Sequence, residues 1–186
     1  MSLQSLPFRP DKAYAAADFT AHGELLGRFF IGDFGYLYRI AKTAGAIGAT
    51  TAVADYAAGK ALKWSDAAAF TVVGAVANTD KVCGVLSAGP GSLTQPGIAP
   101  AGPVTLASGD IFAMQVSGRY AGFVGSAASD QVDAGEYVFA STDADTGKLD
   151  DGGTTFAWQV TFGIARATSS TADARVPVDL QGVLVG

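Results

Sequence analysis

Short apolar runs separated by glycine-centred turns are the feature that most constrains this chain, and they are clearest between Ser108 and Asp151. Gly109-Asp110, Gly118 and Gly147 each interrupt a hydrophobic run of strand length, as does Gly135-Glu136. This spacing is typical of short strands joined by tight turns. We therefore predict a mainly-β fold, a compact antiparallel β-barrel or β-sandwich, with a jelly-roll topology among the alternatives.

The size and composition of the chain predict one domain that assembles with others. Its 186 residues suffice for a hydrophobic core, and we assign residues 44–186 to a β-rich domain and residues 1–43 to an N-terminal arm with linking strands. Hydrophobic residues make up 49% of the chain and charged residues only 16%, which is little for the surface of a solitary domain. We therefore expect a homo-oligomer.

The N-terminal arm is predicted from residues that have no local means of burial. Pro7 and Pro10 keep the opening segment extended, and the alanine-rich segment 13–21 is too short to form a helix alone. Five apolar or aromatic side chains in this segment are expected to contact a partner: Leu3, Leu6, Phe8, Tyr14 and Phe19. The aromatic runs 25–31 and 34–40, separated by Gly32-Asp33, are either a hairpin of the domain or further anchors of the arm, and we favour the hairpin.

Further strands are expected along the rest of the chain. Residues 56–64 form either a short helix or a turn leading into a strand that ends at Trp64. Runs 70–77 and 82–86 are predicted to form a hairpin through residues 78–81. The segment 88–103 is rich in proline and glycine and is predicted to form a long exposed loop.

The C-terminal part contains the two clearest alternating patterns. Residues 154–165 alternate large apolar with small or polar side chains, and so do residues 175–185. Pro177 has no N–H donor, so the last strand should lie at a sheet edge or leave its N–H side unpaired.

No residue pattern predicts catalysis or a cofactor, and we expect the protein not to be an enzyme. His22 is the only histidine and lies in a polar turn without a recognisable nucleophile motif. The weak candidates for a metal site are the carboxylates of one loop, but their spacing does not match an EF-hand and solvated turn residues are the simpler explanation: Asp143, Asp145, Asp150 and Asp151.

Charge and hydropathy exclude several other classes of partner. The net charge of −5 argues against direct binding of nucleic acid. The apolar runs are too short to cross a membrane, and the first ten residues do not resemble a signal peptide, so a soluble product made in the cytoplasm is expected. The single Cys83 is expected to be a buried hydrophobic residue.

The second half of the chain resembles the small β-barrel decoration or cement proteins that bind the heads of tailed bacteriophages. The residues that carry the resemblance succeed one another as Ser108-Gly-Asp110, Val116-Ser-Gly118, Ala134-Gly-Glu-Tyr-Val138, Gly147, Gly163-Ile-Ala165 and Val176-Pro-Val-Asp-Leu180. The resemblance implies an oligomer, often a trimer, on the capsid surface of the virion. There it would bind the major capsid protein and stabilise the head against DNA pressure. It transfers no individual site residue.

Two other functions fit the composition. A tail-tube or other virion structural subunit would be equally rich in strands and poor in charge. A carbohydrate-binding β-sandwich would need an aromatic cleft, for which Trp64, Trp158, Tyr120 and Tyr137 are candidates, although packing in the core explains them more simply.

Overall fold

The computed structural model describes residues 14–15, 25–32, 35–48, 59–86, 106–125, 131–141, 147–151, 161–169 and 174–181. These residues form eleven β-strands and no α-helix. The predicted mainly-β class is confirmed. Segment 88–103, most of the alternating segment 154–165, and the turn residues Asp33 and Phe34 lie outside the described residues.

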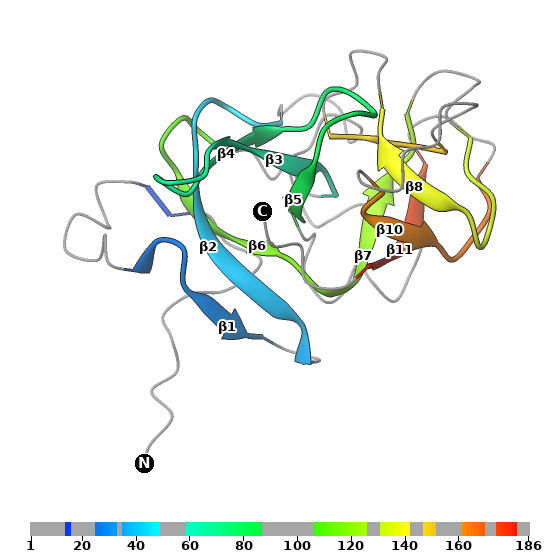
Figure 1. Cartoon of the computed structure of the whole chain (residues 1–186), viewed down its shortest axis with the longest axis horizontal. Coiled ribbons are helices and arrows are strands. Elements are labelled where there is room, and N and C mark those ends of the chain that lie inside the picture. Colours follow the sequence, from blue (N-terminus) through cyan, green and yellow to red (C-terminus); the bar gives the residue numbers. More distant parts are fainter. Residues whose placement is uncertain are drawn as a thin grey trace.

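The first six strands form one sheet that closes on itself (Figure 1). The strands are β1 (Phe29–Ile31), β2 (Leu37–Thr43), β3 (Ala61–Asp66), β4 (Thr71–Gly74), β5 (Val82–Val85) and β6 (Ile111–Gln115). Their order is β1-β2-β4-β3-β5-β6, and β6 also pairs with β2. Strands β2 to β6 therefore form a closed five-stranded barrel, and β1 is attached to the outside of β2. All pairs are antiparallel except β2 with β4.

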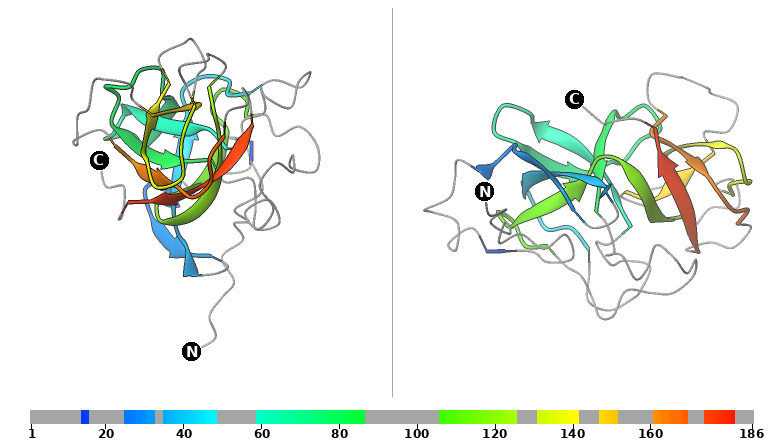
Figure 2. Two further views of the ribbon diagram at one scale, coloured as in Figure 1. Left: turned by 90° about the vertical axis from the view of Figure 1, so that its right-hand side faces the viewer. Right: turned by 90° about the horizontal axis from the view of Figure 1, so that it is seen from below.

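The last five strands form a second ring beside the first (Figures 1 and 2). They are β7 (Gly118–Phe123), β8 (Tyr137–Ala140), β9 (Leu149–Asp150), β10 (Gly163–Ala165) and β11 (Arg175–Leu180), in the order β7-β11-β10-β8-β9. A parallel bridge between Val124 and Leu149, with a hydrogen bond from the N–H of Gly125 to the carbonyl of Leu149 at 2.8 Å, connects the end of β7 to β9. This sheet therefore also closes into a five-stranded barrel.

The two barrels have the same topology. When β2 to β6 are matched in chain order with β7 to β11, every neighbouring pair of the first ring has its counterpart in the second, including the single parallel contact. The registers agree as well. Leu62 of β3 lies opposite Gly84 of β5, and at the matching place Val138 of β8 lies opposite Gly163 of β10. The protein is a tandem repeat of one barrel unit.

The loop that precedes the second strand of each barrel repeats in the same detail. The N–H of Gly59 donates to the carbonyl of Leu86 at 2.6 Å, and the N–H of Gly135 donates to the carbonyl of Ala165 at 2.8 Å. Both glycines have left-handed backbones, with φ of 92° and 94°. A conformation that favours glycine thus recurs at one place in the unit.

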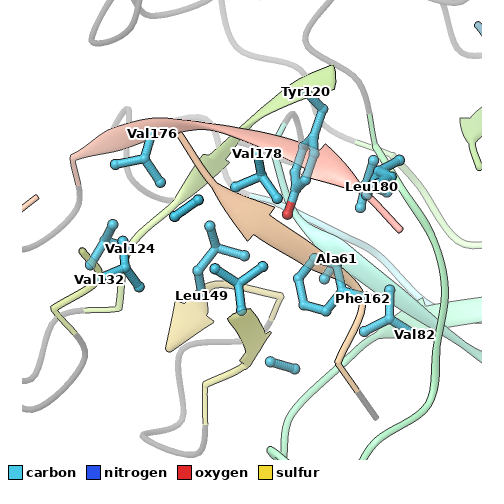
Figure 3. Packing of buried hydrophobic residues seen from close by; sticks show 14 of the residues in the cluster. Ala61, Val82, Tyr120, Val124, Val132, Leu149, Phe162, Val176, Val178 and Leu180 are labelled. Atoms are coloured by element: carbon cyan, nitrogen blue, oxygen red, sulfur yellow. The ribbon is translucent and has the colours of Figure 1, made fainter. Parts of the chain in front are cut away.

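The interiors of the barrels are apolar, and one cluster is shared between them. Ala61, Ala75, Val82 and Val85 of the first barrel pack against the interior of the second, around Tyr120, Leu149 and Val178 (Figure 3). A second cluster, which includes Leu62, Val72, Phe112 and Met114, fills the first barrel. Only Val116 and Ser117 separate β6 from β7. One apolar cluster therefore extends from the second barrel into the first, beside a separate cluster in the first barrel.

The predicted hairpin between residues 70–77 and 82–86 is wrong. Strand β3 lies between β4 and β5 and pairs with both. The carboxylate of Asp80 holds the loop between β4 and β5 against β3. It accepts hydrogen bonds from the N–H groups of Val76 and Ala77 at 2.8 and 3.0 Å, and it binds Nζ of Lys63 on β3 at 2.9 Å. The chain is thereby directed across β3 to its other side.

Strand β11 is not an edge strand, because it pairs with β7 and with β10. The carbonyl of Pro177 accepts the N–H of Arg166 at 2.8 Å, so the imide nitrogen of Pro177 also faces that side, just beyond Ala165, the last residue of β10. The sequence left two alternatives for this strand, a place at the sheet edge or an unpaired N–H side at Pro177. The structure has the second of them.

The linking strands expected before residue 44 are β1 and β2, and both belong to the first sheet. Strands β1 and β2 form the favoured antiparallel hairpin, with Ile31 opposite Leu37, and β2 is a member of the first barrel. The strand alternative for residues 56–64 is likewise confirmed by β3.

Candidate functional site

The predicted metal and catalytic residues do not form a described site. Asp143, Asp145 and His22 lie outside the described residues. Asp150 is a buried residue of β9 and Asp151 follows it. Among the residues that the structure describes, no group of three histidine, cysteine or acidic side chains is placed to hold a metal ion.

Of the predicted partner contacts, only Tyr14 is described. Its N–H and carbonyl exchange hydrogen bonds of 2.9 Å with Ile111 of β6, and its side chain packs on Ile40 and Ile111. Tyr14 therefore contacts its own barrel. Leu3, Leu6, Phe8 and Phe19 lie outside the described residues, so the docking arm stays a prediction.

The aromatic residues considered for a carbohydrate cleft are not gathered in one place. Tyr120 is fully buried inside the second barrel, 6.4 Å from the ring of Phe162, whereas Trp64 packs on the cluster of the first barrel. Core packing is confirmed for Tyr120. Trp158 lies outside the described residues.

A guanidinium held among aromatic rings is the most unusual group on the first barrel. The Cζ atom of Arg39 on β2 lies 4.9 Å from the ring centre of Phe29 and 5.0 Å from those of Trp64 and Phe70. Nε of Arg39 donates to the carbonyl of Gly27 at 3.2 Å. Buried Nη1 of Arg39 and buried Nε1 of Trp64 have no hydrogen-bond acceptor among the described residues. We call Phe29, Ile31, Arg39, Trp64 and Phe70 the β1 surface.

Phe70 takes a strained backbone conformation to reach this place. Its φ is 51°, and it is the one described residue other than glycine with a positive φ. The second barrel has Gly147, with φ of 78°, at the matching position two residues before the parallel contact. The ring of Phe70 lies over Gly27, where any Cβ would come within 2.3 Å of it. The left-handed backbone therefore recurs in both barrels, and the strain in the first barrel arises because phenylalanine and not glycine occupies the position; such strain often marks functional sites.

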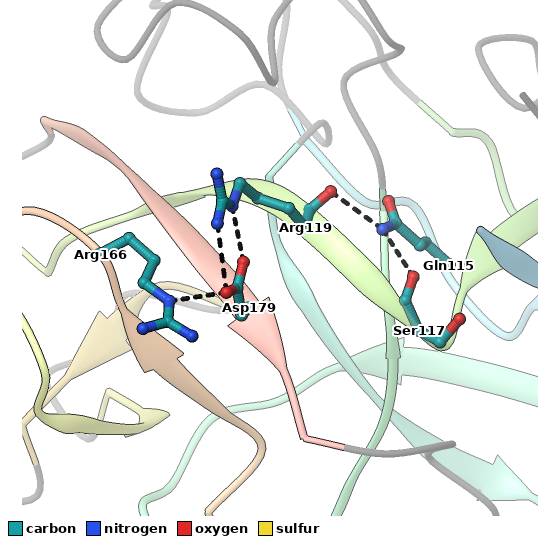
Figure 4. Close-up of polar contacts among 5 residues, drawn as sticks. All are labelled: Gln115, Ser117, Arg119, Arg166 and Asp179. Carbon is teal, nitrogen blue, oxygen red and sulfur yellow. Dashed lines mark hydrogen bonds and ion pairs between the residues drawn. The ribbon is translucent and has the colours of Figure 1, made fainter. Parts of the chain in front are cut away.

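The second barrel has an exposed charged cluster in place of an added strand (Figure 4). Asp179 of β11 binds Nε of Arg119 at 2.6 Å and Nε of Arg166 at 2.6 Å. The hydrogen bond from Arg119 lowers the pKa of Asp179, partial burial opposes this, and the hydrogen bond from Arg166 lowers it further. Nearby, Nε2 of buried Gln115 donates to the carbonyls of Ser117 and Arg119 at 2.8 and 3.0 Å.

Gln115 explains why the second barrel has no counterpart of β1 among its described residues. Arg119 matches Tyr38, whose backbone faces Phe30 of β1. In the second barrel the side chain of Gln115 satisfies the carbonyl of Arg119 instead. Sequence reasoning missed the β1 surface because it depends on side chains far apart in the chain. It also missed the contact of Gln115 with the carbonyl of Arg119, although these residues are only four positions apart.

Cys83 is inert in the folded protein. It is buried in the first barrel, and burial raises the pKa of its thiol to about 12. It is therefore a thiol and not a reactive thiolate at neutral pH.

Comparison with known proteins gives similarities to solved structures alone. No protein-family model and no curated protein matches the sequence. The fold is similar to the crystal structure of the head fiber gp8.5 N base in bacteriophage phi29, with 13% sequence identity and a TM-score of 0.45 over 80% of this chain and 97% of that chain. No described helix is both long enough and apolar enough to span a membrane.

Proposed function

We propose that the protein is a structural protein of a phage head, a decoration or cement protein that binds the major capsid lattice and stabilises the shell. The observation that carries the proposal is the place of the residues that resemble this family. From Gly118 to Leu180 they lie in the strands β7, β8, β10 and β11 and in their turns, so the resemblance extends over the second barrel and includes four of its five strands.

The composition supports assembly on a large surface. Charged residues make up only 16% of the chain, and Phe29 and Ile31 of β1 are 42% and 73% exposed. Exposed apolar side chains of this size favour burial against a partner. The low content of charged residues supports the proposed homo-oligomer, with the trimer that the resemblance implies.

Binding to heads lacking the protein tests the proposal. Purified protein should sediment with such heads and add density to their outer surface in electron microscopy, and coated heads should release DNA at a higher temperature. Density confined to the tail would instead assign it to the tail tube. Failure to bind either structure would contradict a virion role.

A further inference from the structure

The outer edge of β1 has the chemistry of a strand-docking site. The N–H of Ile40 donates to the carbonyl of Arg28 at 3.0 Å, and the N–H of Gly32 donates to the carbonyl of Tyr36 at 2.9 Å. Backbone groups of residues 28, 30 and 32 therefore face β2, and those of Phe29 and Ile31 face outward, because direction alternates along a strand. No described residue pairs with this outer side.

The side chains of this edge do not protect it. Proteins usually shield a free edge by keeping the strand short, or with charged residues, proline or a bulge; β1 is short, at three residues, but has no charge, proline or bulge. Here the two outward-facing residues are Phe29 and Ile31, 42% and 73% exposed. An added strand would gain both backbone hydrogen bonds and apolar contacts.

Two unpaired hydrogen-bond donors beside this edge indicate that the added strand brings a hydrogen-bond acceptor. Nη1 of Arg39 and Nε1 of Trp64 have no acceptor among the described residues, and the ring of Phe29 covers the guanidinium. An unpaired buried donor costs about 1–3 kcal/mol. Phe29 is partly exposed, so rotation of its ring admits a carboxylate or carbonyl oxygen to Arg39.

A second copy of this edge does not meet that need. Pairing β1 with β1 would bring only Phe29, Phe30 and Ile31 to the site, and none of them has a side-chain acceptor. It would also place Arg39 of both copies in one sheet. Charge complementarity therefore favours a different protein with an acidic side chain.

We propose that β1 binds an extended, acidic segment of a head protein, which adds a strand to the first barrel and places a carboxylate against Arg39. The identity of the partner as a head protein rests on the proposed function. The additional strand β1 and a phenylalanine at position 70, where the second barrel has Gly147, are two features in which the first barrel departs from the second, and both lie at this surface.

Ile31→Pro tests the backbone contact. The N–H of Ile31 faces outward, so proline removes a donor from the free edge while the bonds to β2 remain. Phe29→Lys and Arg39→Gln test the apolar and charged contacts. Each variant is expected to bind heads at least tenfold more weakly than the unchanged protein. Val76→Lys is the matched control, because Val76 is 45% exposed and lies away from β1.

The outcomes separate this inference from the function on which it rests. If the unchanged protein fails to bind heads, the proposed function is wrong and the partner assignment falls with it. If it binds and the three variants bind equally well, the β1 surface is not the docking site. If the variants instead lower the oligomer mass in light scattering, a second copy occupies the edge and the proposed acidic partner is wrong. Circular dichroism and melting temperature check that each variant is folded.

Discussion

The phenol of Tyr120 lies in the shared core with its hydroxyl directed into the cluster (Figure 3). The oxygen has no hydrogen-bond partner among the described residues, and burial raises its pKa well above the ordinary value. Tyr120→Phe removes an unsatisfied polar group and keeps the ring. We expect it to increase the free energy of unfolding by about 1 kcal/mol in urea titrations.

Tyr120→Leu is the control for this change, since it also removes the hydroxyl but leaves space unfilled. It should lower the free energy of unfolding by about 2 kcal/mol. A loss of stability in Tyr120→Phe would mean that the hydroxyl has a partner.

The strain at Phe70 is measurable by comparing two substitutions that both remove its ring. Phe70→Ala and Phe70→Gly lose the same contact with Arg39, but alanine keeps a Cβ at a φ of 51°. Phe70→Gly should therefore be more stable than Phe70→Ala by about 1 kcal/mol in thermal unfolding. Equal stability would show that this backbone relaxes once the ring is gone.

The ion pairs of Asp179 give the second barrel a pH dependence. Its folded pKa is lowered, so its contribution is present above the unfolded value of about 4 and is lost as the pH falls through the folded value. Asp179→Asn should be less stable than the unchanged protein at pH 6 by less than about 1 kcal/mol, because the arginines are half exposed. The difference should shrink between pH 5 and pH 2; a constant difference would contradict the assignment.

The backbone conformation of the turn glycines could be predicted from the sequence. The conformation of residues that are held by contacts with distant parts of the chain could not. Gly109, Gly118, Gly135 and Gly147 were expected at turns and all have positive φ. Phe70 has the same backbone conformation but is held by Gly27 and Arg39, which lie about forty and thirty residues earlier. No local pattern predicts a contact of that kind.

At the scale of the strand, Gly84 of β5 and Gly163 of β10 occupy the same position in the two barrels. A Cβ at Gly84 would meet Sδ of Met114 at 2.8 Å, whereas one at Gly163 would meet Cγ1 of Val178 at 2.5 Å and the carbonyl of Asp179 at 2.9 Å. Methionine is flexible and yields more easily than a β-branched residue and backbone. Both alanine variants should lower the melting temperature, and Gly163→Ala should cost about 1–3 kcal/mol and more than Gly84→Ala. The reverse order would mean that the second barrel adapts more readily.

The order of strands was less predictable than their existence. Strands β4 and β5 follow one another closely, and adjacent strands most often pair, which led to the wrong hairpin. The position of β3 between them depends on Asp80, which binds a lysine on β3 and two backbone donors of its own loop. Pro177 also gave only part of the answer. It showed that one backbone N–H donor of β11 is missing, but it did not show where β11 lies in the sheet.

At the scale of the whole molecule, the shared core makes the barrels one cooperative unit. Ala61, Ala75, Val82 and Val85 of the first barrel are buried with the interior of the second. We expect a single unfolding transition, with calorimetric and van't Hoff enthalpies in agreement and the same midpoint by fluorescence and circular dichroism. Two separate transitions would show that the barrels are independent.

The repeat itself was hidden from the sequence because matching positions share burial and not identity. Leu62 corresponds to Val138, Cys83 to Phe162 and Trp64 to Ala140, according to the registers of the two rings. A closed barrel needs apolar side chains inward, and many residues meet that need. The glycine-centred turns could be seen in the sequence. Only the pairing of the strands shows that they recur at equivalent places in two barrels.

The shared core also sets an order of events during synthesis. The first barrel has all its strands once Gln115 has left the ribosome, and chains fold from the amino end. Its face formed by Ala61, Val82 and Val85 stays bare until β11 emerges at Arg175 to Leu180 and the second barrel closes over it. A nascent chain from which Gln115 has emerged but β11 has not therefore carries a complete first barrel with an exposed apolar face, and such a face promotes aggregation until the second barrel covers it.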